Sequence, residues 1–315
     1  MGANILLINT GGTIAMAATK VGFAPKAGLL EQALDGLRRD GMQSHISLTA
    51  FTPLIDSANA SFADWNRIAK TIAQAHDHYD GFIVTHGTDT LAFTSAALCF
   101  ALEGLAKPVI LTGSMVPLGI KGSDGAGNLI DAIAAAETAP PGVWVQFAGQ
   151  RLHGARIRKV HSQAHGAFSA SDNSAIPPLQ VAPNLIRHVF GNPDLVILSM
   201  APGQSVKAMT AALALCDGGV LRVFGAGTLP DDAGLAAALH AAHARGIPMI
   251  AVSQSAEGGV RLGTYAAGNL LREAGVIDGA DMTPEAAYAK LAHVLSLPEP
   301  DRAARLHRTL CGESQ

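Results

Sequence analysis

Charged residues are scarce in this chain: they make up 15% of 315 residues, and the formal net charge is only -3. Lysine and arginine form no block, so the sequence lacks the basic surface that binds nucleic acid, and we expect no nucleic-acid partner. A low charge content is typical of chains partly covered by other subunits, although alanine-rich helices lower it without any interface. Composition therefore suggests self-association without deciding it.

Cysteine and long apolar runs are also rare. Three widely spaced cysteines, Cys99, Cys216 and Cys311, do not suit a disulfide framework or a zinc knuckle. His76 and His78 lie near the end of a helical stretch with no HExxH or CxxC motif beside them, so we expect no metal site. The N-terminal run "ILLI" follows no basic region and is too short for a signal peptide or a membrane span. This predicts a cytoplasmic protein with no membrane partner.

Apolar residues, by contrast, make up 49% of the chain, which is enough for a substantial core. In the first half, uninterrupted apolar runs alternate with helical candidates. The strand candidates are 4–9, 47–52, 81–87, 107–114 and 142–149, and the helical candidates are 28–40, 61–78, 89–104 and 124–138. This alternation predicts the α/β class, with a parallel sheet covered on both faces.

The second half repeats the alternation after a stretch rich in Ser, Asn and Pro. Further strand candidates lie at 194–203, 219–228 and 247–255, with helices at 205–216 and 232–245. Another helix is expected after Thr283, which can cap it, with Pro284 in its first turn. We therefore predict a larger N-terminal domain (1–175), a linker (176–193) and a smaller C-terminal α/β domain (194–315).

Two threonine-rich motifs follow strand candidates: "NTGGTIAM" at 9–16 and "THGTDT" at 85–90. Ligands collect at the carboxyl ends of parallel strands, so we expect the two motifs to converge. Neither GxGxxG nor GxxxxGK[ST] accompanies them, which argues against these phosphate-binding loops. The incomplete glycine runs "GAGN" at 125–128 and "GAG" at 225–227 are typical of tight turns.

The residues alone leave the role of the second motif open. Thr88 and Asp89 could cap a helix, could take part in catalysis, or could do both. The basic stretch "RLHGARIRKV" could be a solvated face, but its Lys159 could also complete a relay that activates a hydroxyl nucleophile beside an acid. No GxSxG elbow or SxxK motif offers a rival nucleophile.

Five segments in order, "TGGTIA", "HGTDT", "GSMVP", "SDGAGNL" and "GARIRKVHS", resemble bacterial L-asparaginases, and specifically their cytoplasmic type I subgroup. The resemblance covers nearly the whole chain, including "FTPLIDSANAS" and "GTYAAGNLLREAGVIDGADMTPEAAYAKL". It implies a larger N-terminal catalytic domain with a Rossmann-like parallel sheet, and a smaller C-terminal domain that completes the active site across a subunit interface. It further implies a homodimer or homotetramer that hydrolyses L-asparagine to L-aspartate and ammonia through a threonine acyl-enzyme, without a cofactor.

The resemblance also implies catalytic roles. Thr13 matches the primary nucleophile, while Thr88, Asp89 and Lys159 match a second catalytic triad. A hydroxyl needs a neighbouring base, and a tetrahedral oxyanion needs prepositioned donors. The expected oxyanion donors are backbone N–H groups of two glycine-threonine pairs, Gly12, Thr13, Gly87 and Thr88.

Substrate contacts follow from the same resemblance. Ser57 matches a holder of the substrate α-carboxylate, and Asp89 a holder of its α-ammonium group. Ala58 stands where some relatives carry a polar side chain for that ammonium group. Ser114 matches a position whose backbone carbonyl accepts a hydrogen bond from the leaving amide.

Phe23 departs from the family pattern, which has a tyrosine on the loop after the nucleophile to help activate it. Phenylalanine keeps the ring but has no hydroxyl to relay a proton. Either Lys159, acting through Thr88 or a water, takes over this role, or the activity is weakened or altered. If Phe23 abolishes turnover, the protein is an amino-acid sensor. Other enzymes on the same scaffold are further alternatives: a glutaminase-asparaginase, or a related amidohydrolase such as the amidase subunit of transfer-RNA-dependent amidation. The amidase subunit normally has a further N-terminal module, whereas this chain starts at its first strand, which disfavours it.

Overall fold

The computed structural model describes residues 2–20, 22–170, 184–263 and 268–315. They form two compact units, Met1–His188 and Val189–Gln315. The division falls inside the predicted linker 176–193, of which residues 176–183 lie outside the described part of the chain. Within that linker, β12 (Ile186–Arg187) pairs antiparallel with β6 (Leu102–Glu103) of the first unit.

The first unit is built on a six-stranded sheet in which five strands run parallel and the last is antiparallel. In spatial order the strands are β4 (His45–Ile55), β1 (Asn4–Gly11), β5 (Gly81–Thr85), β7 (Pro108–Thr112), β8 (Gly142–Phe147) and β9 (Gln150–His153). The central strands β5, β7 and β8 are buried throughout, as their uninterrupted apolar sequences require. The predicted α/β class is confirmed.

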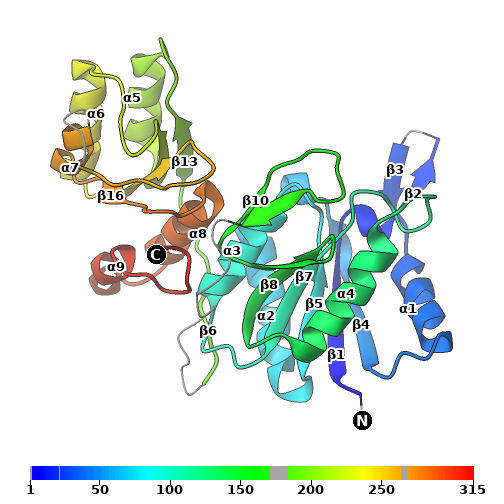
Figure 1. The fold of residues 1–315 in the computed structure, drawn as a ribbon. Helices are drawn as coiled ribbons and strands as arrows, with labels where there is room; N and C mark the ends of the chain where they lie inside the picture. Colours follow the sequence, from blue (N-terminus) through cyan, green and yellow to red (C-terminus); the bar gives the residue numbers. More distant parts are fainter. Residues whose placement is uncertain (1, 21, 171–183, 264–267) are drawn as a thin grey trace. The chain divides into compact units, whose positions relative to one another are not determined.

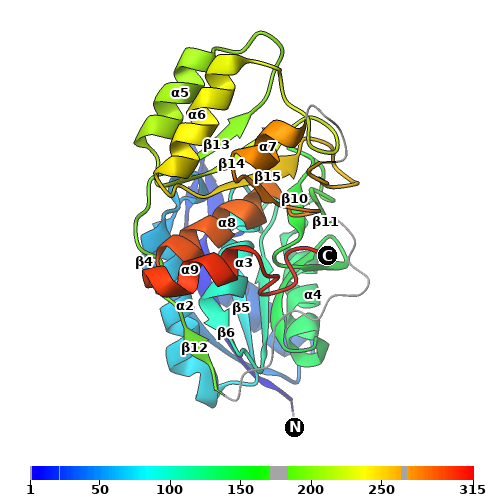
Figure 2. The same cartoon turned by 90° about the vertical axis from the view of Figure 1, so that its left-hand side faces the viewer.

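Helices cover both faces of this sheet (Figures 1 and 2). On one face, α1 (Leu29–Arg39) and α4 (Gly125–Thr138) pack onto a core that includes Ile5, Leu7 and Ile110. The other face carries α2 (Phe62–Ala75) and α3 (Leu91–Ala101). A capping box starts α2, because Ser61 and Asp64 satisfy each other's backbone N–H groups.

One predicted turn is wrong. Residues 125–128, "GAGN", form the first turn of α4, because the apolar helical pattern of the following residues continues back through them. The second run, at 225–227, does form a turn, in which Gly227 donates to the Phe224 carbonyl at 3.0 Å.

Two short hairpins that the sequence did not reveal complete the first unit. In one, β2 (Met16–Thr19) pairs with β3 (Gly22–Pro25), and in the other β10 (Ile157–Lys159) pairs with β11 (Phe168–Ala170). Both strands of the first hairpin are too short and too exposed to carry an apolar alternation.

The second unit has a smaller parallel sheet of β13 (Leu195–Ser199), β14 (Gly218–Val223), β15 (Met249–Ser253) and β16 (Ile277–Asp278). One face packs against α5 (Val206–Leu215), α6 (Ala233–Ala244) and α7 (Asn269–Glu273), and the other against α8 (Pro284–Leu295). Figure 2 shows α5 and α6 side by side. Helix α8 starts as predicted, with Thr283 accepting from the Ala286 N–H, and α9 (Glu299–Leu306) follows it.

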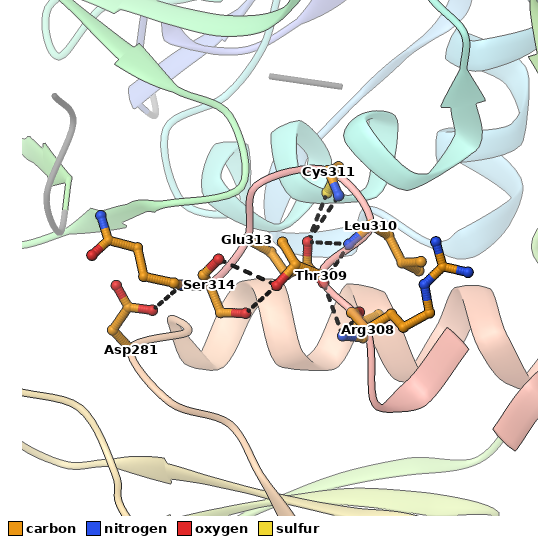
Figure 3. Close-up of polar contacts among 9 residues, drawn as sticks. Asp281, Arg308, Thr309, Leu310, Cys311, Glu313 and Ser314 are labelled. Atoms are coloured by element: carbon orange, nitrogen blue, oxygen red, sulfur yellow. Dashed lines mark hydrogen bonds and ion pairs between the residues drawn. The ribbon is translucent and has the colours of Figure 1, made fainter. Parts of the chain in front are cut away.

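A buried ion pair anchors the C-terminal turn to α8 (Figure 3). Lys290 and Glu313 are 1% and 0% exposed, and the Lys290 Nζ lies 2.8 Å from Glu313 Oε1. Lys290 also donates to the Arg308 carbonyl at 2.7 Å. The Glu313 carboxylate accepts from the backbone N–H groups of Leu310 and Cys311 at 2.9–3.1 Å. Each charge therefore has several partners that replace its lost hydration.

Replacing Lys290 with Met should lower the stability of the second unit by about 3–5 kcal/mol, because Glu313 would remain buried without its cation. Urea unfolding, followed by far-ultraviolet circular dichroism, measures this loss of stability. Asp35→Asn is the matched control, since the Asp35–Arg38 pair is exposed and should contribute no more than about 1 kcal/mol. Equal urea midpoints for the two variants would contradict the expectation.

Candidate active site

Two glycines bring the threonine-rich motifs together at the carboxyl edge of the first sheet. Asn9 of β1 pairs with Thr85, the last residue of β5, and β1 continues to Gly11. Just beyond, Gly12 lies so close to the Gly87 backbone that an added Cβ would overlap it, and Gly12 has φ +85°. A Cβ on Gly87 would overlap Ser57. Only glycine permits this approach, and the expected convergence of the motifs is observed.

Side-chain hydrogen bonds connect the carboxyl ends of β1 and β5. Asn9 Oδ1 accepts from the Gly11 N–H at 3.0 Å and from Thr85 Oγ1 at 3.2 Å. Thr10 Oγ1 donates to the Thr85 carbonyl at 2.6 Å. The half-buried Thr13 comes directly after this region, in a one-turn helix from Thr13 to Ala15. Its backbone is therefore held by the sheet rather than by a loop.

Lys159 lies at the end of β10 and connects two residues of the second motif. Its Nζ donates to Thr88 Oγ1 at 2.9 Å and to Asp89 Oδ1 at 2.8 Å. Thr88 is buried, whereas the Asp89 side chain is 65% exposed. The structure thus brings together the three residues expected to form a triad, although 70 residues of sequence separate Lys159 from Asp89. A hydroxyl that accepts from an amine in this way can pass its own proton onward.

The expected substrate-holding residues surround this cluster. Ser57 is buried in a short helical turn, and its carbonyl accepts from Thr90 Oγ1 at 2.7 Å. The neighbouring Ala58 is exposed. Ser114 is fully buried in the loop after β7, whose Gly113 packs against the His86 carbonyl. Three loops of the carboxyl edge therefore lie together, and each contributes backbone groups and a hydroxyl.

Phe23 lies on the exposed hairpin that follows Thr13. It pairs with Ala18 across β2 and β3, and 54% of its surface is exposed. The hairpin is tied back to the turn of Thr13, because the Lys26 N–H donates to the Ala15 carbonyl at 2.9 Å. The ring at position 23 thus stands on the hairpin that directly follows the Thr13–Ala15 turn.

Sequence reasoning missed a buried chain of hydrogen bonds behind Gly87. Trp65 Nε1 is within 3.1 Å of Thr94 Oγ1, which lies 3.0 Å from His86 Nε2, and His86 Nδ1 lies 2.8 Å from the Gly87 carbonyl. Indole can only donate, so Thr94 accepts from Trp65 and donates to His86. The Gly87 carbonyl can only accept, so His86 Nδ1 donates to it, and the lowered pKa of the buried ring favours the neutral form in which Nε2 accepts from Thr94. No motif or residue spacing in the sequence indicated this chain of contacts.

Acid should destabilise the protein partly through His86. Burial lowers the pKa of His86 from its ordinary value of 6.5, and this outweighs the opposing effects of the Gly87 carbonyl and Asp64. Below that pH the unfolded chain binds a proton that the folded protein does not, so stability falls by up to about 1.4 kcal/mol per pH unit. Urea unfolding at pH 7.0 and 5.5 should show a smaller loss for His86→Gln than for the unsubstituted protein. Equal losses would show that His86 is not the group responsible.

Comparison with known proteins places this geometry in context. Residues 4–187 match the family description "Asparaginase, N-terminal", and residues 194–306 match "Glutaminase/Asparaginase C-terminal domain". The chain belongs to the asparaginase family. It is 37% identical to L-asparaginase 1 of Escherichia coli K12, over 93% of this chain and 92% of that protein. It is 36% identical to an L-asparaginase of Thermococcus kodakarensis, over 98% of both chains.

Solved asparaginase structures have the same fold. The thermostable L-asparaginase from Thermococcus kodakarensis superposes with a TM-score of 0.89 over 99% of both chains, at 33% identity. L-asparaginase I from Vibrio cholerae superposes with a TM-score of 0.88 over 100% of both chains, at 32% identity. The division into a larger and a smaller α/β unit is therefore the asparaginase arrangement.

Among the described residues, no group of three or more His, Cys, Asp or Glu side chains is arranged to hold a metal ion. In the same part of the chain, none of the helices combines the length and apolar character needed to cross a membrane. Lys159, Thr88 and Asp89 are in contact at the sheet edge where Gly12, beside Thr13, approaches Gly87.

Proposed function

We propose that this asparaginase-family protein hydrolyses L-asparagine to L-aspartate and ammonia, with Thr13 as the nucleophile. The observation that carries the proposal is the contact of Lys159 with Thr88 and Asp89, at the sheet edge where Gly12 and Gly87 meet. The relatives named L-asparaginase support the choice of substrate.

In the proposed first half-reaction, Thr13 Oγ attacks the side-chain amide carbon of the substrate and loses its proton. The backbone N–H groups of Thr13 and Thr88 stabilise the resulting oxyanion. The proton passes to the amide nitrogen, the C–N bond breaks, and ammonia leaves an aspartyl ester on Thr13. In the second half-reaction a water molecule, activated by Lys159 through Thr88, cleaves that ester and restores the hydroxyl.

Residues around the Thr88–Lys159 contact are proposed to bind the α-carboxylate and α-ammonium groups of the substrate. We place the α-carboxylate at Ser57 and the α-ammonium group at Asp89, whose exposed carboxylate can pair with a cation. The exposed Ala58 adds no polar contact, so the affinity for the ammonium end should be modest. The Ser114 carbonyl accepts from the leaving amide nitrogen.

Ammonia release from L-asparagine, D-asparagine and L-glutamine tests the proposal in one assay. We expect release from L-asparagine, and release from none of the three would overturn the function. Calorimetric binding of L-asparagine without turnover would instead support the amino-acid sensor. The glutamine arm measures whether the site has room for one more methylene, which typically discriminates by about 1–3 kcal/mol.

Phe23→Tyr should raise kcat for L-asparagine, by up to about 10²-fold, because a phenol on the hairpin after Thr13 can relay its proton. Steady-state ammonia release measures the change. Phe23→Leu is the control, since it removes the ring without adding a hydroxyl and should not raise kcat. An unchanged kcat in Phe23→Tyr would show that another group already accepts the Thr13 proton. Turnover in Phe23→Tyr but not in the unsubstituted protein would show that no other group accepts this proton.

The assembly and location of the protein belong to the same proposal. We propose a cytoplasmic homodimer or homotetramer in which the C-terminal domain of one subunit completes the site of another. Light scattering coupled to gel filtration measures the mass of the particle, and a monomer of 32.3 kDa would exclude the shared site.

A further inference from the structure

The loop after β7 is held by a carboxylate to which the proposed reaction assigns no role. Asp124 Oδ1 and Oδ2 accept from the Met115 N–H at 3.0 and 2.9 Å, and Oδ1 also accepts from the Val116 N–H at 2.9 Å. Charge-assisted hydrogen bonds of this kind are about twice as strong as neutral ones. Asp124 therefore determines the course of the backbone directly after Ser114.

Asn128 holds the other side of the same loop. Its side chain is 2% exposed, and Nδ2 donates to the Gly113 carbonyl at 3.0 Å and to Asp124 Oδ2 at 3.1 Å. Its Oδ1 accepts from the Ala148 N–H at 2.9 Å. Ala148 has φ +48°, a conformation that costs an alanine about 1–2 kcal/mol. Asn128 thus ties the ends of β7 and β8 into one unit.

Helix capping does not explain these contacts. Asp124 occupies the N-cap position of α4, a helix described in full, yet its side chain makes no capping hydrogen bond to that helix. An N-cap aspartate usually accepts from the second or third N–H of its own helix. Here both carboxylate oxygens are directed to the Ser114 loop instead. The sequence spacing of four residues between Asp124 and Asn128 places both side chains on the same side of the first helical turn.

We propose that Asp124 and Asn128 are positioning residues for the leaving amide: together they hold the Gly113–Val116 loop so that the Ser114 backbone carbonyl meets the departing nitrogen. This inference rests on the proposed function. Ser114 is 0% exposed, and within the described chain its Oγ has no hydrogen-bond partner. Its side chain therefore does not hold the loop in place, and the neighbouring backbone contacts do.

The contact with the leaving nitrogen should matter most in the transition state. The nitrogen gains a proton as the C–N bond breaks, so its N–H groups become stronger donors to the Ser114 carbonyl. An interaction that strengthens on the way to the transition state lowers kcat when it is lost and changes KM less. A misplacement of the Ser114 loop should therefore appear mainly in kcat for the amide.

The test compares two substrates that differ only in the leaving group. The leaving group of L-asparagine is ammonia, and the amide nitrogen that becomes ammonia carries hydrogens that it can donate to the Ser114 carbonyl. The leaving group of L-aspartate β-methyl ester is methanol, and its oxygen carries no hydrogen in the ester. Asn128→Leu and Asp124→Asn should lower kcat for the amide by about 10- to 100-fold. The loss for the ester should be smaller, so the amide-to-ester ratio of kcat falls. A general loss of folded enzyme lowers both rates equally.

Asp232→Ala is the matched control. Asp232 caps α6 in the second unit, accepting from the Gly234 and Leu235 N–H groups at 2.8 and 3.0 Å. Its loss should reduce stability without changing the amide-to-ester ratio. Amide hydrogen exchange of the 113–118 segment gives a second readout, and it should speed up in Asp124→Asn but not in Asp232→Ala.

The outcomes separate the two proposals. An unsubstituted protein that cleaves neither substrate overturns the proposed function and the inference that depends on it. An active protein whose folded Asp124→Asn and Asn128→Leu variants keep the amide-to-ester ratio overturns this inference alone. If Asn128→Leu fails to fold, Asp124→Asn decides, because it keeps the shape of the side chain.

Discussion

Thr13→Ala should reduce ammonia release from L-asparagine by at least about 10³-fold, because the acyl-enzyme route loses its nucleophile while the rest of the site stays in place. Binding should survive this change. The backbone at position 13 is held by the hydrogen bonds of Asn9 and Thr10 and by the close approach of Gly12 to Gly87, none of which uses the Thr13 side chain. Stopped assays of ammonia and calorimetric binding of L-aspartate measure the two effects separately.

Thr13→Ser is the natural comparison, since it keeps the hydroxyl and removes one methyl group. It should retain a measurable kcat, well above that of Thr13→Ala. If Thr13→Ala released ammonia at the unsubstituted rate, Thr88 would become the candidate nucleophile. Mass spectrometry of the unsubstituted protein, quenched during turnover, locates the aspartyl ester. In our scheme the added mass lies on the peptide that contains Thr13, and with Thr88 as the nucleophile it lies on the peptide that contains Thr88.

Lys159→Met should lower kcat by about 10²- to 10⁴-fold, the usual range for loss of an acid-base group. Lys159 is the residue that contacts both Thr88 and Asp89, so its removal separates the hydroxyl from the carboxylate. Methionine has a similar length and no charge, so the packing of the stem is kept. Steady-state kinetics with L-asparagine give kcat and KM.

Lys159→Arg distinguishes charge from proton transfer. Arginine can keep the ion pair with Asp89, but its guanidinium does not give up a proton in proteins. If Lys159 relays a proton through Thr88, the arginine variant should stay at least about 10-fold below the unsubstituted kcat. Full activity in the arginine variant would reduce the role of Lys159 to its positive charge.

The sheet and its helices were predictable because their signals are local. Strands such as β5, β7 and β8 are mostly apolar and fully buried, and α8 begins with Thr283 as its N-cap and Pro284 in its first turn. The positions of Thr13, Thr88 and Lys159 in ordered motifs were enough to propose a site, since the carboxyl ends of parallel strands meet at one edge.

The parts that sequence reasoning missed depend on contacts between distant residues. The hairpin carrying Phe23 buries too little apolar surface to leave a pattern. His86 and Trp65 are 21 positions apart, and each lies within hydrogen-bond distance of Thr94 Oγ1. The sequence assigned no role to Asp124, and only its distances to Met115 and Val116 reveal that it holds the Ser114 loop. Such side-chain to backbone contacts have no spacing rule that a sequence pattern can detect.

The close approach of Gly12 and Gly87 bears on attempts to redesign the substrate range. A Cβ at either position would overlap backbone or Ser57, so randomising them should yield mostly misfolded proteins. In the hairpin, Phe23 is more than half exposed, whereas Gly22 beside it has φ +123°, a conformation that strains any other residue. Directed evolution for a longer or bulkier amide should therefore keep the two glycines unchanged and place its diversity at Phe23 and at Ala18, its partner across the hairpin.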